Sequence, residues 1–537
     1  MSSLILHPSL LLNNSNKIIS NIDLHNSQYD SNNFGFQLLG SYVGDPTFIS
    51  HHIQDYINDI SKIASNLSLF PHHQCRQLMF MYSFCNRINH IFRTTDPYLL
   101  KDLINKFQDL KYKLLLISTN QPSIPSLHFK QASLPINMGG LGIIDSNLTS
   151  HSASIASFLN SYEDIMYHFP TSNFQNNCSY NYLFDSIQYC NNNINNSDRD
   201  NFNFNQLITT YSKSNSPSLK IQNIISTKLL LFYQTNFITS LQQIPGCHYL
   251  AWYTSVSDST SGNYLLTSPK NPELIFSNTE FSTALSLRLH LTLPNIPPNK
   301  ICTCKSNTII DQRGYHLLTG CKDHGIRQFH HHNLQSSISS LLKYAGFANT
   351  IEETNCFRNV DPTNNCRPDI TIHHPQLLDF NNELLLDVSL ASPIEGIQKG
   401  AISNLSVLTA SKKFRAGLNR FQSKMNKYSL MAKENNKSFL PFIMETSGSI
   451  LPENNEFLKK VARIGGEKHH IPFSIFYNYM MKRISCSIQK SFCSKINFMI
   501  SKIAIPIQIK KFVQNNIIDH VGVNILNSNP HYNINRH

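Results

Sequence analysis

Four side chains of the kind that bind zinc lie within twenty residues of this chain. They are Cys302, Cys304, His316 and Cys321, with eleven residues between the second cysteine and the histidine and four between the histidine and the last cysteine. Three thiolates and one imidazole are the ligand set of a closed tetrahedral structural zinc site. The sequence therefore predicts a zinc knuckle, with ordinary buried cysteines beside a surface histidine as the alternative.

The other cysteines favour metal binding over disulfide formation. The 537-residue chain has 12 cysteines spread from Cys75 to Cys493, and it does not open with a basic segment followed by an apolar one. This pattern predicts an intracellular protein with reduced thiols, in which a close Cys/His cluster is a metal site. No run of 18 apolar residues occurs, so a membrane is not an expected partner.

Two carboxylates lie on neighbouring strands of a predicted hairpin. Residues 368–374 (PDITIHH) and 383–391 (ELLLDVSLA) have the composition of short strands, and a turn-like stretch joins them. Asp369 and Asp387 could together hold Mg²⁺ or Mn²⁺, which would lower the pKa of a bound water and neutralise charge at a phosphodiester. A hairpin Asp is more often a turn cap or a solvated edge residue, and that alternative stays open.

Other charged residues could complete such a site. Glu353 lies upstream, where we expect a helix to supply a third acid, and Lys424 and Lys427 lie downstream on a predicted Lys/Arg-rich helix over 410–435. An acid on a helix followed by Asp on each of two strands is the layout of the PD-(D/E)XK nuclease core. Ser389 stands where that pattern has lysine, so either another lysine reaches the site or the site is inactive.

Positive charge is concentrated in the last quarter of the chain. The formal net charge is +12, and residues 411–513 contain 19 Lys and Arg against 5 Asp and Glu. This concentration favours a polyanionic partner, with a solvated Lys-rich surface as the alternative. The cations expected to contact nucleic acid are Arg367, Lys412, Lys413, Arg415 and Arg420.

Helical periodicity dominates much of the remaining sequence. Asp96-Pro97 predicts the start of a helix whose apolar face contains Leu100, Leu103, Phe107, Leu110 and Leu114. Further helices are expected at 207–241 and at 328–345, where Gly346 would form the C-terminal cap. The Asn-rich stretch 171–205 is predicted to be a loop or linker.

Three adjacent histidines lie within the helix expected at 328–345. They are His330, His331 and His332. Neighbouring side chains on a helix point about 100° apart, so the three cannot all face one ion. We expect one of them to be functional and the others to lie on the surface.

The order of these motifs resembles the carboxyl-terminal half of a non-LTR retrotransposon polyprotein of the restriction-like-endonuclease type. The residues that carry the resemblance are the four knuckle residues, His331-His332-Asn333, Arg367-Pro368-Asp369, Asp387, and Lys424, Lys427 and Tyr428 followed by FLPFIMETSG at 439–448. In that family a reverse transcriptase precedes the knuckle and the nuclease.

The amino-terminal half is similar to the thumb of such reverse transcriptases. The similar segments are FGFQLLGSYVGDPTFI (34–49), NRINHIFRTTDP (86–97) and QASLPINMGGLGIIDSNLTSHSASIASF (131–158). The LP..GGLG string in the last segment is the most specific local match. Gly139 and Gly140 within it are expected to serve a tight turn.

The resemblance implies an α+β multidomain protein with a helical thumb-like bundle, a helical connector, a zinc knuckle and a small α/β restriction-endonuclease-like core. The expected segments are a polar leader (1–33), a reverse-transcriptase thumb-like region (34–165), an Asn-rich linker (166–206), a helical connector (207–295), the zinc knuckle with its helix (296–346), a restriction-endonuclease-like domain (347–450) and a basic C-terminal region (451–537).

The resemblance also implies a Mg²⁺- or Mn²⁺-dependent endonuclease that nicks target DNA. Asp369 and Asp387 would hold the ion, Glu353 would complete its ligands or orient the water, and Lys424 or Lys427 would stabilise the charged transition state. DNA is the expected partner, with RNA as a second candidate. Nuclear localisation is expected because chromosomal DNA would be the substrate.

Two departures from the family keep other functions open. No palm motif with paired aspartates occurs, so the chain is not expected to synthesise DNA by itself, and a separate reverse transcriptase is an expected partner. Ser389 in the lysine position favours an inactive, nucleic-acid-binding remnant of a retrotransposon as the alternative function. A poorly folding product of a decayed element copy is a further alternative.

Overall fold

The computed structural model describes residues 35–515 of the chain. Within that range it leaves out residues 39–40, 169–180, 200–201, 212–219, 295, 303, 305–306, 322–323, 355, 359–365 and 395–403. The predicted leader and the first part of the Asn-rich stretch therefore lie outside the described residues. Among the described helices, none is long and apolar enough to cross a membrane.

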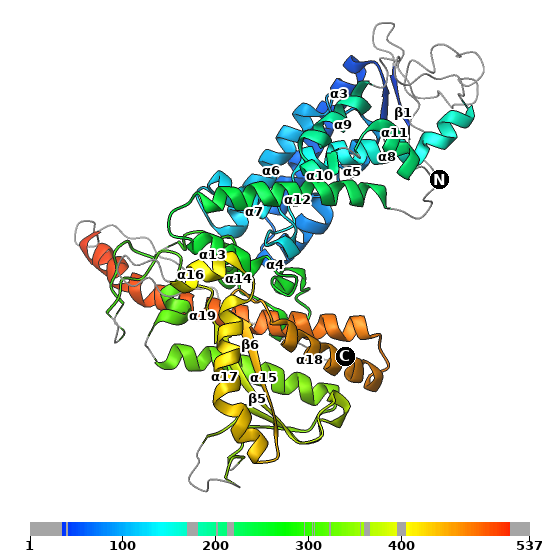
Figure 1. Cartoon of the computed structure of the whole chain (residues 1–537). Helices are drawn as coiled ribbons and strands as arrows, with labels where there is room; N and C mark the ends of the chain where they lie inside the picture. Colours follow the sequence, from blue (N-terminus) through cyan, green and yellow to red (C-terminus); the bar gives the residue numbers. More distant parts are fainter. Residues whose placement is uncertain are drawn as a thin grey trace, which may run out of the picture.

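Helices make up most of the described chain, and a small sheet lies in its C-terminal half (Figure 1). The first half contains β1 (Gly35–Leu38), β2 (Ser41–Gly44), α3 (Pro46–Ser68), α4 (His73–Met79), α5 (Asn89–Thr94), α6 (Lys101–Thr119), α7 (Ser126–Ala132), α8 (Ser146–His168), α9 (Asn181–Asn192), α10 (Asn196–Arg199), α11 (Phe204–Tyr211) and α12 (Ile221–Gln242). The second half contains α13 (His248–Val256), α14 (Asn278–Arg288), α15 (His324–Ala345), β3 (Asn349–Ile351), β4 (Ile370–Ile372), β5 (Leu384–Ala391), α16 (Asn404–Ser411), α17 (Arg415–Glu434), β6 (Ser438–Glu445), α18 (Pro452–Lys468) and α19 (Phe473–Asn515). This content agrees with the predicted α+β class.

Helix α6 has the predicted apolar face but starts later than predicted. Leu103, Phe107, Leu110 and Leu114 are all buried. The carboxylate of Asp96 accepts a hydrogen bond from the backbone N–H of Tyr98 at 2.8 Å, and the N–H of Leu100 donates to the carbonyl of Pro97. Asp96 therefore caps a separate turn over 97–100, and the helix itself begins at Lys101.

The Asn-rich stretch contains helices, so the prediction of a loop is wrong for its described part. Helix α9 buries Leu183, Ile187 and Cys190, which recur at helical spacing. These side chains pack in one cluster with residues of α8 and α12. Burial of this apolar face outweighs the low helix propensity of the asparagines around it.

The LP..GGLG string forms a turn that requires both of its central glycines. Gly139 has φ +85°, a left-handed conformation that glycine adopts without strain. At Gly140 a Cβ atom would lie 1.9 Å from the carbonyl oxygen of Leu134, so no side chain fits there. The predicted tight turn at these residues is confirmed.

The sheet has the strand order β3-β4-β5-β6. β3 with β4 and β4 with β5 are antiparallel, and the pairing of Ile370 with Leu386 confirms the predicted hairpin. β5 and β6 are parallel, and α16 and α17 form the crossover between them.

The two faces of the sheet are covered by different helices. Leu386 and Val388 of β5 belong to the same buried cluster as residues of α15. Leu385 packs with Ala432 of α17 on the opposite face. Helix α17 therefore covers the face of the sheet from which the odd-numbered side chains of β5 project.

Two helices near the sheet differ from their predicted bounds. α15 begins at His324 and ends at Ala345, where Gly346 (φ +108°) forms the predicted left-handed cap. The helix predicted over 410–435 is divided, because Phe414 has φ +62° between α16 and α17.

The C-terminal basic region is part of the packed structure as far as it is described. Met480, Ile484, Ile488, Phe492 and Ile496 of α19 are buried, and α19 contacts α14, α15 and α18. One continuous cluster of buried apolar residues extends in sequence from Ile49 to Ile496. Figure 1 shows α19 running through the part of the molecule that also holds the sheet.

Candidate active site and metal centre

The two predicted carboxylates lie near each other on the hairpin, since the charge of Asp369 raises the pKa of Asp387. Asp369 directly precedes β4 and Asp387 lies in β5. The pairing of β4 with β5 ends at Ile370 with Leu386, so Asp369 lies just before the paired residues and Asp387 just after Leu386.

Hydrogen bonds from α15, from β5 and from the backbone N–H of Glu352, which donates to the Asp369 carbonyl at 3.2 Å, hold Asp369 in place. Its Oδ2 accepts the backbone N–H of Val388 at 2.6 Å and lies 3.1 Å from His331 Nε2. Its carbonyl accepts from the side-chain amide of Gln335 at 2.8 Å. His331 and Gln335 are one turn apart on α15, so this helix fixes both ends of the residue. The hydrogen bond with Asp369 raises the pKa of the His331 imidazole, although burial opposes this shift.

Asp387 is paired with a lysine from the crossover helix. Lys424 Nζ lies 2.7 Å from one carboxylate oxygen and 3.0 Å from the other. Both side chains are largely shielded, with 17% of the lysine and 12% of the aspartate exposed. Burial raises the pKa of the Asp387 carboxyl, and nearby Asp369 raises it further, whereas Lys424 and Arg420 lower it.

Two cations of α17 contact β5 near the position that holds a lysine in the nuclease pattern: Arg420 contacts Ser389, which stands at that position, and Lys424 contacts Asp387. Ser389 is buried and its hydroxyl accepts a hydrogen bond from Arg420 Nε at 3.0 Å. Arg420 and Lys424 are four residues apart and therefore lie on one face of the helix. Positive charge thus reaches this face of the sheet from α17 instead of from β5.

Glu353 and Lys427 have other direct partners, although the charge of Asp387 also raises the pKa of Lys427. Glu353 follows β3 in a loop, not in the expected helix, and its carboxylate accepts a hydrogen bond from Thr350 at 3.0 Å. Lys427 is exposed and lies 4.8 Å from the ring centre of Tyr428, which raises the pKa of the lysine. β3 ends at Ile351, so Glu353 lies in the loop that directly follows this strand.

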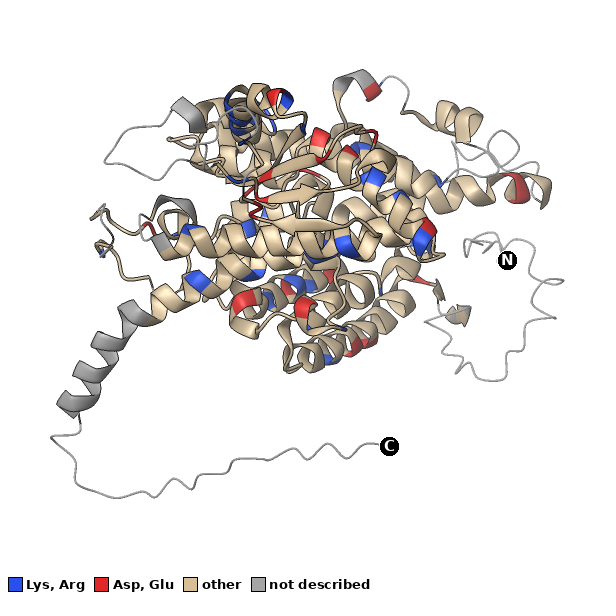
Figure 2. Ribbon diagram, turned by 90° about the horizontal axis from the view of Figure 1, so that it is seen from below, with Lys and Arg blue, Asp and Glu red and all other residues tan. Residues whose placement is uncertain are grey.

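The predicted nucleic-acid-binding cations have different surroundings. Arg367 is exposed and lies 3.9 Å from Glu352. Lys413 donates to the carbonyl of Ser257, and Lys412 is exposed. Figure 2 shows basic and acidic segments interspersed along the described ribbon. Arg420 contacts the strand that carries Asp387, through the Ser389 hydroxyl.

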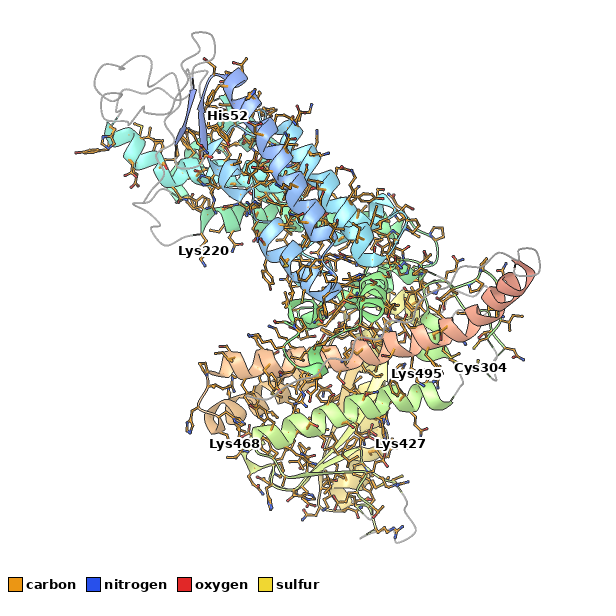
Figure 3. All side chains as sticks on the ribbon, turned by 180° about the vertical axis from the view of Figure 1, so that it is seen from behind. His52, Lys220, Cys304, Lys427, Lys468 and Lys495 are labelled. Atoms are coloured by element: carbon orange, nitrogen blue, oxygen red, sulfur yellow. The ribbon has the colours of Figure 1, made fainter. Side chains whose placement is uncertain are left out.

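The four predicted zinc ligands come together in one buried group. Cys302, Cys304, His316 and Cys321 are all buried, and their ligand atoms all lie within 4.8 Å of one another. Figure 3 labels Cys304 near the part of α19 that carries Lys495. The group is therefore part of the packed structure.

Two of the six separations within this group match those expected around a zinc ion. Zn–S bonds of about 2.3 Å at tetrahedral angles place two sulfurs about 3.8 Å apart, and a Zn–N bond of about 2.05 Å places sulfur and nitrogen about 3.6 Å apart. Cys302 Sγ and Cys321 Sγ are 3.8 Å apart, and Cys304 Sγ and His316 Nε2 are 3.6 Å apart. The cluster could hold a metal ion and is compatible with structural zinc.

Backbone and carboxylate hydrogen bonds shape the loops that carry the ligands. The N–H of Cys302 donates to the carbonyl of Thr308 at 2.8 Å, which closes the loop that contains Cys304. The carboxylate of Asp311 accepts the backbone N–H of His316 at 2.7 Å. His316 Nδ1 lies 3.1 Å from the Thr308 hydroxyl, so its Nε2 is oriented toward the thiols in the way that outer partners orient metal-binding imidazoles.

Sequence reasoning did not assign His331 and Arg420 to the carboxylate site. His331 was one of three candidate histidines, and His330 is buried against α19, with Nδ1 at 3.1 Å from the Ser491 hydroxyl. The spacing of His331 and Gln335 by four residues is a signal that both face one strand. No comparable local signal connects Arg420 with Ser389, because their contact depends on the packing of α17.

Comparisons with known proteins give a partial match. No family model matches the chain. The chain is similar to the retrotransposable element SLACS 132 kDa protein of Trypanosoma brucei gambiense, with 27% identity over 177 residues. The match covers 33% of this chain and 14% of the length of that protein. This similarity supports a retrotransposon-related origin for the chain.

Proposed function

We propose that the chain is a metal-dependent endonuclease that nicks DNA at the site formed by Asp369 and Asp387. The observation that carries this proposal is the contact of Lys424 with Asp387, at 2.7 and 3.0 Å. It supplies, from α17, the cation that Ser389 cannot supply from β5. Two neighbouring carboxylates with an adjacent lysine are the minimal set of groups for this chemistry.

Each residue of the site has a distinct role in this proposal. Asp369 and Asp387 would hold Mg²⁺ or Mn²⁺, because hard divalent cations bind carboxylate oxygens together with water and phosphate. The ion would supply a bound water of lowered pKa and would neutralise charge on the phosphate. Lys424 stabilises the charge that develops on the scissile phosphate, and Arg420 adds a second positive charge one turn away. Val388 N–H and His331 hold the carboxylate of Asp369 in place.

The wider expectations follow from this activity and from the retrotransposon-related origin. DNA would be the substrate, with RNA as a second candidate, and exposed cations such as Arg367 and Lys412 would contact its phosphates. The Cys/His cluster would hold Zn²⁺ in a structural role. A separate reverse transcriptase would use the nick, and a chromosomal substrate would place the protein in the nucleus.

A plasmid nicking assay with Mg²⁺ or Mn²⁺ tests the activity. We expect the wild-type chain to convert supercoiled plasmid to the open circle, and Asp369→Ala to reduce the rate at least 100-fold. Lys424→Met should reduce the rate at least tenfold, whereas Lys433→Met, at the exposed end of the same helix, should leave it unchanged. Equal nicking by the wild type and Asp369→Ala would remove the catalytic assignment.

A second candidate function is nucleic-acid binding without cleavage. The position of Glu353 favours it, because the hydrogen bond with Thr350 leaves two carboxylates at the site instead of three. Binding would then depend on the cations of α17 and weaken steeply with salt. Salt-sensitive DNA binding without nicking in Mg²⁺, Mn²⁺, Co²⁺ or Ca²⁺ would select this function over the enzyme.

A further inference from the structure

A cavity of about 590 Å³ lies where the first helices meet α12 and the segment before α14. One wall is built by the LP..GGLG turn, through Pro135, Ile136, Asn137 and Gly142. The volume falls in the range of pockets that hold small organic ligands, which is about 300–1,000 Å³. The most specific string of the amino-terminal half therefore shapes a pocket that lies outside the nuclease site.

A buried lysine whose described hydrogen-bond partners are neutral lines this cavity. Lys111 is 2% exposed, and its Nζ donates to the carbonyl of Ile144 at 2.7 Å and to the hydroxyl of Ser146 at 2.8 Å. Both acceptors also line the cavity. An ammonium group has three N–H donors, so one is left for a further acceptor. Burial lowers the pKa of Lys111, and the more distant charges of Cys85 and Asp145 oppose this shift.

A second buried cation stands behind the same wall. Arg288 is 2% exposed and donates to the carbonyl of Gly140 at 3.0 Å, to that of Ile136 at 2.6 Å and to the hydroxyl of Ser261 at 2.9 Å. All its described partners are neutral. A buried charge that is not balanced by an opposite charge is costly, and a bound anion would reduce that cost.

The remaining lining is neutral, with apolar side chains such as Phe92, Ile136 and Leu230 beside polar ones. It contains five asparagines, several serines and the aromatic ring of Tyr82, which is 60% exposed, and it contains no Asp or Glu. Two acidic residues near Lys111 have other partners: Asp109 on the same helix pairs with Lys113, and Asp145, whose charge raises the pKa of Lys111, accepts the backbone N–H of Asn147 at the start of α8. Amide side chains offer both donors and acceptors to the edge of a base, and an aromatic ring offers a stacking surface.

We propose that this pocket binds a nucleotide unit, with its phosphate paired to Lys111 and its base contacted by the amides and Tyr82 at the rim. Lys111 supplies the free N–H and the charge, and Arg288 adds to the positive field without a direct contact. The proposal is independent of the nuclease site, because Lys111 contributes nothing to the group around Asp387.

Calorimetric titration of the full-length chain with deoxyadenosine monophosphate and with deoxyadenosine tests the proposal. We expect the monophosphate to bind at least tenfold more tightly than the nucleoside, and Lys111→Met to abolish that preference. Lys113→Met is the matched control, since Lys113 lies on the same helix, is 59% exposed and pairs with Asp109 instead of the cavity. This control should bind like the wild type.

The result is decisive even if Lys111→Met does not fold. Asn137 is exposed at the mouth of the pocket, so Asn137→Asp should fold normally and weaken monophosphate binding at least threefold by adding a negative charge. Absence of monophosphate binding, equal binding of the two ligands, or wild-type binding by folded Lys111→Met or by Asn137→Asp would overturn the proposal. Repeating the titration with a 5′-phosphorylated trideoxynucleotide distinguishes a strand end, which would bind more tightly than the monophosphate, from a free nucleotide.

Discussion

Replacing Lys424 by methionine should destabilise the sheet at neutral pH through the charge that it leaves on Asp387. The substitution keeps an unbranched apolar stem of similar length but removes the only described ion-pair partner of a carboxylate that is 12% exposed. Removing one member of a buried pair costs about 3–5 kcal/mol, and the partial exposure and nearby Arg420 favour the lower end, about 3 kcal/mol. Asp387→Asn should cost only about 1 kcal/mol, because the long lysine side chain can extend into water.

The two substitutions should be strongly non-additive. The double variant leaves no buried charge, so it should resemble Asp387→Asn alone, and the coupling energy should be about 2–3 kcal/mol. Hydrogen exchange of the β5 amides, measured by mass spectrometry at pH 7.5, reports the local free energy of opening without requiring the whole chain to unfold in one step.

The effect should depend on pH in a defined direction. Burial raises the pKa of the Asp387 carboxyl, and loss of Lys424 removes the largest influence that lowers it. A carboxyl whose pKa is higher in the folded than in the unfolded state costs stability above its folded pKa, and the cost disappears as the pH falls through that value. The defect of Lys424→Met should therefore shrink at pH 5. Unchanged β5 exchange at pH 7.5, or a defect that grows on acidification, would refute the charge argument.

Three further predictions concern other parts of the molecule. The purified chain should contain one zinc by elemental mass spectrometry, and Cys304→Ser or Cys321→Ser should lose it together with a lower thermal midpoint, whereas Cys75→Ser should keep both. Burial lowers the pKa of His151 and of His330 to about 4, so the folded chain favours the neutral form of both imidazoles. Chemical denaturation should show stability falling as the pH is lowered from about 6.5, by about 2 kcal/mol per histidine at pH 5, and His330→Gln should reduce this dependence. Gly140→Ala should lower the thermal midpoint more than Gly142→Ala, because an added Cβ meets a backbone oxygen at 1.9 Å in the first case, whereas in the second it meets only a side-chain carbon at 3.9 Å and the cost is that of the left-handed backbone (φ +73°).

The parts of the site that depend on local sequence could be predicted. The two segments alternate or are continuously apolar as strands are, and they are near in sequence, so an antiparallel pair that brings Asp369 and Asp387 near each other could be predicted. The spacing of the cysteines and His316 likewise limits the loop that joins them. Both predictions rest on contacts between residues that are near in sequence.

The parts that depend on packing between distant segments were harder to predict. Lys424 is 37 residues from Asp387, and the sequence offered Lys427 as an equal candidate until the position of α17 distinguished them. Glu353 was expected on a helix because the nuclease pattern begins with one, but it lies in the loop that follows β3. The Asn-rich stretch was predicted as a loop because propensity was weighed without the apolar face that α9 buries.

The position of α17, and with it the candidate active site, depends on segments outside 347–450. Glu445 at the end of β6 is fully buried, and its carboxylate accepts the backbone N–H of Gly417 in the first turn of α17 at 3.1 Å and the hydroxyl of Ser255 in α13. Burial raises the pKa of Glu445, so these donors are needed to stabilise its charge. Lys413 also binds the carbonyl of Ser257. Because α13 thus holds the start of the helix that carries Lys424, an isolated fragment over 347–450 would lose both the apolar packing and the hydrogen bonds that aim Lys424 at Asp387.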